Sequence, residues 1–121
     1  MKYRVSWEGK TVRVDYFGDI VNGDIENAHS DLNNDDRFYR CDNLILDVSE
    51  CNLAQVNVPR LIVVVAVDLG ASMSNKSLKV AMIANDPINV AKVSEYIATS
   101  CVSPWEYKIF ASVDDASAWL N

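Results

Sequence analysis

Three short apolar runs, each followed by a segment with helical spacing, constrain the fold of this chain most strongly. The runs are "NLILDVS" at 43–49, "LKVAMIAN" at 78–85 and "EYKIFAS" at 106–112. Runs of this length and composition are typical of buried strands. Segments long enough to form a helix connect them, as parallel neighbours require, and such crossovers are right-handed. The pattern predicts a parallel sheet built from βαβ units.

Three of the predicted helices carry recognisable start signals. Asn22 is placed to cap the first helix, and Asp86 followed by Pro87 is placed to start the third. Ser112 and Asp115 form an S-x-x-D capping pattern at the last one. The apolar stripes of these helices are formed by Val21, Ile25, Ala28 and Leu32, by Val90, Val93, Ile97 and Cys101, and by Val113, Ala116, Trp119 and Leu120.

The segment 59–71 is ambiguous, because its "LIVVVAV" core is β-branched and on propensity alone favours a strand. Its position between two predicted parallel strands favours a helix. Pro59 suits a first helical turn, and Gly70 suits a helix end. A helix that is apolar nearly all round is either deeply buried or presents an apolar face to a partner.

The opening segment "YRVSWEGKTVRVDYFG" alternates apolar and polar residues on both sides of Glu8 and Gly9, which is typical of a β-hairpin. The predicted order is therefore β-β-α-β-α-β-α-β-α. We expect an α/β fold in one domain spanning 1–121. Its mixed sheet has about five strands, an antiparallel hairpin followed by parallel strands, and is packed by about four helices.

Composition excludes several classes of function. The formal charge is −6, with 17 acidic and 11 basic residues, which argues against nucleic acid as a partner. No stretch is long and apolar enough for membrane insertion, and the start of the chain lacks a secretory signal. Cys41, Cys51 and Cys101 form no C-x-x-C spacing, so we expect reduced thiols, a cytoplasmic location, and neither a metal nor a cofactor.

The order of elements resembles the STAS family of anti-sigma-factor antagonists, and most closely the SpoIIAA-like bacterial proteins of uncharacterised function. The hairpin, the strands "LILDVS" and "LKVAMIAN" and the closing "VDDASAWL" carry this resemblance. It implies a non-enzymatic regulatory or protein-interaction module. In phosphorylation-controlled members, a D-S-S-G-like segment after the first of these strands carries the phosphoacceptor serine. That segment falls on 55–58 here, where no hydroxyl residue stands.

The loop 49–59 and the start of the following helix are therefore the predicted contact surface for a protein partner. The residues assigned to it are Asp47, Ser49, Gln55 and Asn57. Two of them have simpler structural interpretations. Ser49 can satisfy the turn after the strand, and Asp47 can accept hydrogen bonds from loop amides.

No catalytic residue is predicted. His29 follows Ala28 at the margin of the first helical stripe, so we expect a partly exposed side chain rather than a catalytic base. Cys51 lies in the candidate loop, but the neighbouring Glu50 disfavours its thiolate. No P-loop, G-x-G-x-x-G or G-x-S-x-G motif occurs. We therefore do not predict an enzyme.

An alternative function is a carrier or sensor for a small apolar ligand. This reading predicts an apolar cavity beside Leu61, Val65 and Leu69, whereas ordinary core packing would leave these side chains in a filled interior. Self-association as a homodimer is a further possibility, because the apolar helix or the aromatic hairpin can supply a contact face.

Overall fold

The computed structural model describes residues 1–121. A five-stranded mixed sheet in the order β1-β2-β4-β6-β7 forms its centre. Its strands are β1 (Tyr3–Glu8), β2 (Thr11–Tyr16), β4 (Asn43–Asp47), β6 (Lys79–Ile83) and β7 (Glu106–Phe110). The helices are α1 (Asn22–Asn33), α2 (Ile62–Ser72), α3 (Pro87–Thr99) and α4 (Val113–Leu120). Short 3-10 helices η1 (Asp36–Arg40) and η2 (Val58–Leu61) and a small pair of strands, β3 (Gly18–Asp19) and β5 (Cys51–Asn52), complete the fold.

The predicted strand directions are confirmed. β1 and β2 pair antiparallel around the turn at Gly9, whose φ of 58° lies in the region that glycine adopts without strain. β2, β4, β6 and β7 are all parallel to their neighbours. The carboxyl ends of β4 and β6 therefore lie at one edge of the sheet, where loops leading to helices gather.

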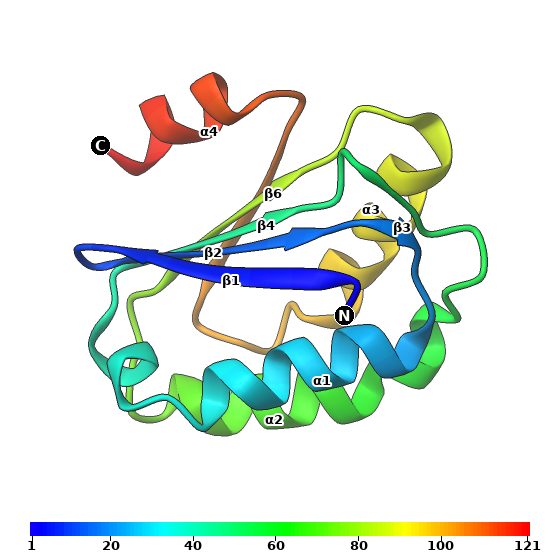
Figure 1. The fold of residues 1–121 in the computed structure, drawn as a ribbon. Helices are drawn as coiled ribbons and strands as arrows, with labels where there is room; N and C mark the ends of the chain where they lie inside the picture. The colour runs from blue at the N-terminus through cyan, green and yellow to red at the C-terminus, as the bar shows by residue number, and fades with distance from the viewer.

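The sheet is covered unequally on its two faces (Figure 1). Helices α1, α2 and α3 lie on one face and α4 alone lies on the other. The larger core, on the three-helix side, contains Leu44, Leu46 and Val80, whereas Ile45 and Ala81 belong to a small second core beneath α4. Alternate residues of β4 and β6 thus enter different cores, which explains why both strands are apolar almost throughout.

The helix between β4 and β6 confirms the helical interpretation of 59–71. Asn57 caps η2, which contains Pro59 and runs directly into α2. Gly70 lies within α2 rather than at its end. Crossover geometry therefore overrides the β propensity of "LIVVVAV", because the long connection between two adjacent parallel strands is usually a helix packed on one face of the sheet.

Two further predicted details at helix ends, besides Gly70, were wrong. Val21 is the residue that precedes α1, and its backbone N–H donates to Asp24 Oδ2 at 2.9 Å. Asn22 instead pairs with the backbone of Asn57, because that segment passes close by. Helix α3 ends at Thr99, so Cys101 falls in the following turn and is exposed.

Candidate ligand cavity and binding surface

Asp47, at the end of β4, is held in a structural network. Its side chain is buried, and its Oδ2 accepts from Arg13 Nη2 at 2.7 Å. Oδ1 accepts from the backbone N–H of Ser49 at 2.9 Å and from its hydroxyl at 2.6 Å. Arg13 is also paired with Asp15 at 2.8 Å. Asp47 and Ser49 thus have the structural roles expected for them: Asp47 accepts hydrogen bonds from the loop, and Ser49 satisfies the turn after β4.

Gln55 and Asn57 are exposed in the segment that leads into η2. Asn57 Oδ1 accepts from the backbone N–H of Arg60 at 3.3 Å, and the backbone of Asn57 is held by Asn22 of α1. Asn57 is thus a helix cap as well as a surface residue. The structure places Gln55 and Asn57 on the surface, while Asp47 is buried away from it.

Helix α2 presents an uncharged apolar face to solvent. We call this the α2 face, and it consists of Ile62, Val63, Ala66, Val67, Leu69, Gly70 and Met73, which are all exposed. Ile62 is 61% and Met73 is 76% exposed. The only charged residue of the helix, Asp68, points into the protein and is 3% exposed. Contiguous exposed apolar surface of this kind is typical of interaction sites.

A cavity of about 50 Å³ lies between the sheet and its three-helix layer. Apolar residues from β4, β6, η2, α1 and α3 form most of its wall, together with the segment before η2. The residues that line it are Tyr16, Ile25, His29, Leu46, Val48, Leu53, Val56, Val58, Leu61, Met82, Lys92, Val93 and Tyr96. Ile25 and Lys92 are the only lining residues that are partly exposed, so the cavity opens beside them.

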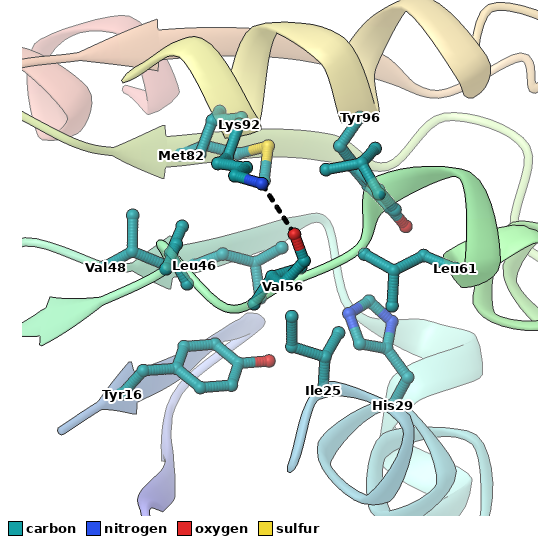
Figure 2. A pocket seen from close by; sticks show the side chains of 13 residues that line it. Tyr16, Ile25, His29, Leu46, Val48, Val56, Leu61, Met82, Lys92 and Tyr96 are labelled. Atoms are coloured by element: carbon teal, nitrogen blue, oxygen red, sulfur yellow. Dashed lines mark hydrogen bonds between the residues drawn. The ribbon is translucent and has the colours of Figure 1, made fainter. Parts of the chain in front are cut away.

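Figure 2 shows this cavity with the side chains that close around it. Lys92 reaches across the opening, and its Nζ donates to the backbone oxygen of Val56 at 2.7 Å. The ammonium group is therefore held at the rim, while its aliphatic stem covers the apolar wall.

His29, which lines the cavity, is paired with a buried carboxylate that lies behind it. Asp68 Oδ2 lies 2.9 Å from His29 Nδ1, and both side chains are only 4% exposed. Asn33 Nδ2 and the Tyr96 hydroxyl also reach the Asp68 carboxylate, each at 3.4 Å. This cluster joins α1, α2 and α3. The expectation of a partly exposed His29 was wrong, because Asp68 supplies a partner that permits complete burial of the ring.

Burial controls the ionisation of the tyrosines around this cluster. It is the main cause that raises the pKa of Tyr16 and of Tyr96 well above the ordinary value, and the charge of Asp68 adds to both. Burial likewise raises the pKa of Tyr107 to about 12. These phenols are neutral donors at physiological pH. The cavity wall contains no serine, threonine or cysteine beside His29, so it offers no hydroxyl or thiol nucleophile of the usual kind.

The three residues predicted to face an apolar ligand are separated by the structure. Leu61 lines the cavity. Val65 is buried in the main core without lining the cavity, and Leu69 belongs to the exposed α2 face. The cavity therefore lies beside η2 and not, as predicted, along α2. On α2, the side chain that points inwards is Asp68, whereas Leu69 is exposed. The binding of a ligand stays a prediction.

One feature of the sequence indicates this site. Asp68 is a single acid inside an otherwise apolar segment, and an isolated carboxylate in such a setting is buried only with a partner. The partner, His29, lies 39 residues earlier, so no local spacing connects them. No group of three or more His, Cys, Asp and Glu side chains is arranged to hold a metal ion. None of the helices combines the length and hydropathy needed to cross a membrane.

Comparisons with known proteins identify the fold. No protein-family model matches the chain, and no curated protein matches it. A solved structure of an uncharacterised DUF3478-family protein with a SpoIIAA-like fold from Shewanella loihica PV-4 aligns with a TM-score of 0.58. It is 16% identical, and the match covers 98% of this chain and 92% of that one.

The anti-sigma factor antagonist SpoIIAA, solved in its unphosphorylated form, aligns with a TM-score of 0.60. It is 10% identical, and the match covers 96% of this chain and 94% of that one. The predicted SpoIIAA-like, STAS-like fold is thereby confirmed. At these identities the likeness concerns the fold alone.

Proposed function

We propose that this chain is a non-enzymatic protein-interaction module. Its contact surface consists of the exposed segment around Gln55 and Asn57 and continues onto the α2 face. The observation that carries the proposal is the α2 face itself, which exposes apolar side chains along the whole helix without one charged residue. The SpoIIAA-like fold supports a regulatory binding role, although the segment at 55–58 has no phosphoacceptor hydroxyl.

The surroundings of the α2 face define the chemistry of its partner. Arg60 and Lys76 flank the helix at its two ends and are both exposed. The chain as a whole is acidic. A protein partner with an apolar patch bordered by acidic side chains would bury the α2 face and meet these two cations. A second copy of this chain is the competing occupant.

Site-specific photo-crosslinking in the native cells tests this surface. A photoreactive amino acid at position 62 should give a defined adduct with one partner protein, and Ile62→Asp with Val63→Asp should abolish co-purification of that protein. The matched control is Val102→Asp, at a position that is 67% exposed but distant in sequence from the α2 face. Equal partner recovery from the two variants would contradict the proposal, and an adduct between two copies would identify a homodimer instead.

Asn57→Arg addresses the loop part of the same surface. It is expected to abolish partner capture while the fold persists. Because Asn57 also caps η2, this change costs about 1 kcal/mol of stability by itself. Gln55→Arg is the cleaner variant, since the Gln55 side chain is exposed and caps no helix. Unchanged capture by both variants would place the interface elsewhere.

A second candidate function is a carrier or sensor for a small, mostly apolar ligand. The cavity favours it, because eleven of its thirteen lining residues are hydrophobic. Native mass spectrometry of the chain purified from its own cells measures a retained small molecule directly. A mass increment that disappears on denaturation supports the carrier, and a bare chain speaks against it. The same spectrum reports subunit number and any phosphate on Ser49.

A further inference from the structure

His29 presents one unpaired ring nitrogen to the cavity. Its Nδ1 is engaged by the Asp68 carboxylate, which can only accept, so Nδ1 carries a ring proton, and in the tautomer with this one proton Nε2 is an acceptor. Nε2 has no hydrogen-bond partner in the protein. Every side-chain nitrogen or oxygen that is fully inaccessible does have a partner, so Nε2 must be accessible to a small probe. Nε2 is therefore reached from the cavity that His29 lines. It is an acceptor held inside a largely apolar wall.

The Tyr16 hydroxyl is a second polar group of the same kind. Tyr16 is 3% exposed and lines the cavity, yet its hydroxyl has no partner in the protein. The same accessibility argument places this oxygen against the cavity. Figure 2 shows Tyr16 and His29 directed toward the interior from β2 and α1. Because its pKa is raised, Tyr16 keeps its proton and can donate.

We propose that the cavity binds a neutral aliphatic molecule by a terminal hydroxyl group. This inference rests on the second proposed function and names its ligand class. The ligand hydroxyl donates its proton to His29 Nε2 and accepts from the Tyr16 hydroxyl, which satisfies both protein groups together. The aliphatic part lies against the apolar wall. A purely hydrocarbon ligand would leave both groups unpaired.

The charges around the cavity favour a hydroxyl over a carboxylate. Asp68 is buried directly behind His29, so an anionic head beside the ring would face a second carboxylate at short range in a poorly solvated setting. The nearest cation is at the opening, where Lys92 is bound to the Val56 carbonyl. A ligand with an anionic head would therefore bind with the opposite orientation, its head at the rim.

The size of the cavity limits how much of the ligand it encloses. A water molecule needs about 10–15 Å³ on this scale, so about 50 Å³ holds the hydroxyl and the first few carbons of a chain. The remaining carbons leave through the opening between Ile25 and Lys92. Short unbranched alcohols are therefore suitable probes.

Titration of the full chain with 1-pentanol, followed by NMR of ¹⁵N-labelled histidine, tests the proposal. Because the chain has a single histidine, every imidazole signal reports on His29. We expect an unprotonated Nε2 whose resonance shifts on saturation with 1-pentanol. Butyl methyl ether is the matched control, because it is an isomer of 1-pentanol that has no hydroxyl group to donate a hydrogen bond. It should bind about three- to tenfold more weakly, which is the effect of one hydrogen bond.

Tyr16→Phe removes only the hydroxyl and breaks no hydrogen bond within the protein. Because the oxygen of the alcohol and that of the ether can both accept from the Tyr16 hydroxyl, this variant should weaken the binding of both probes by a similar factor, whereas only the alcohol donates to His29 Nε2. Equal binding of the alcohol and the ether would overturn the hydroxyl assignment while the carrier function stands. Tighter binding of pentanoate, or an Nε2 that already carries a proton, would also overturn it. If none of the three probes binds, the inference and the carrier function both fail.

Discussion

The Asp68 and His29 pair allows a quantitative test of how the three-helix layer is held together. The perturbation is Asp68→Ala, which removes the carboxylate that receives hydrogen bonds from α1 and α3. In the native protein this carboxylate lies 2.9 Å from His29 Nδ1 and 3.4 Å from the Tyr96 hydroxyl. Both partners are buried in the native protein, so the change removes an acceptor that water cannot readily replace.

The expected loss of stability follows from these contacts. The short contact to His29 involves a charged acceptor and is worth about 1.5–3 kcal/mol. The two 3.4 Å contacts, to Tyr96 and Asn33, are at the long limit and together contribute about 1 kcal/mol. Alanine is the better helix former and returns roughly 0.5 kcal/mol. Asp68→Ala should therefore lower the free energy of unfolding by about 2–3.5 kcal/mol.

Urea unfolding monitored by tryptophan fluorescence measures this change, because Trp105 is buried in the main core. A double-mutant cycle with His29→Ala isolates the pair. We expect a coupling energy of about 1.5–3 kcal/mol, because each single variant already removes the shared interaction. The exposed pair of Asp35 and Arg37 provides a control cycle with much weaker coupling.

Additive effects of Asp68→Ala and His29→Ala would refute the reasoning. Additivity would mean that each residue contributes only through its own packing and that the hydrogen bond between them adds nothing. A loss of stability below 1 kcal/mol for Asp68→Ala would have the same meaning, because it would show that His29 and Tyr96 find other partners.

Two further predictions concern ionisation. Burial, followed by the charge of Asp47, raises the pKa of Cys51 to about 12, so a disulfide reagent at pH 8 should react with it about a thousandfold more slowly than with an unperturbed thiol. Cys101 is exposed and should give the single fast phase, which Cys101→Ser removes; a fast phase that persists would contradict this assignment. The pKa of Tyr107 is raised to about 12 and that of Tyr16 further, so the folded state holds these protons more tightly than the unfolded chain does. The contribution of these phenols to the free energy of unfolding is then fully present below pH 10 and falls as the pH rises toward 12. Tyr16→Phe should make this fall shallower when unfolding is measured across that range. An identical slope would argue against a buried phenol.

The order and direction of the main strands could be predicted because each depends on local pattern and on general rules of connection. The apolar run 43–49 needs two covered faces, and the segment 59–71 must cross back over the sheet. Capping predictions held where the partner is two or three residues away, as at Asp86 and Ser112. They failed at Asn22, whose side chain binds Asn57 in a segment that only the tertiary fold brings near.

The candidate site was predictable only in part for the same reason. Gln55 and Asn57 were assigned to the contact surface because they follow a strand end; both are exposed, and their role in binding a partner stays a prediction. The cavity depends on Tyr16, His29 and Lys92, which come from three distant elements and share no sequence spacing. Its polar side depends on a buried pair 39 residues apart. A pattern of hydrophobicity indicates which residues are buried, but not which buried polar groups form hydrogen bonds with one another.

Asp68 has a consequence for the proposed interface as well as for the cavity. Helix α2 is apolar almost all round, so hydrophobic burial alone distinguishes weakly between one face of the helix and another. The carboxylate removes this ambiguity, because only one rotation of the helix places it against His29. That rotation necessarily turns Ile62, Val67 and Met73 outwards. The pair of Asp68 and His29, of which His29 lines the cavity, thus also fixes which apolar residues α2 exposes to solvent.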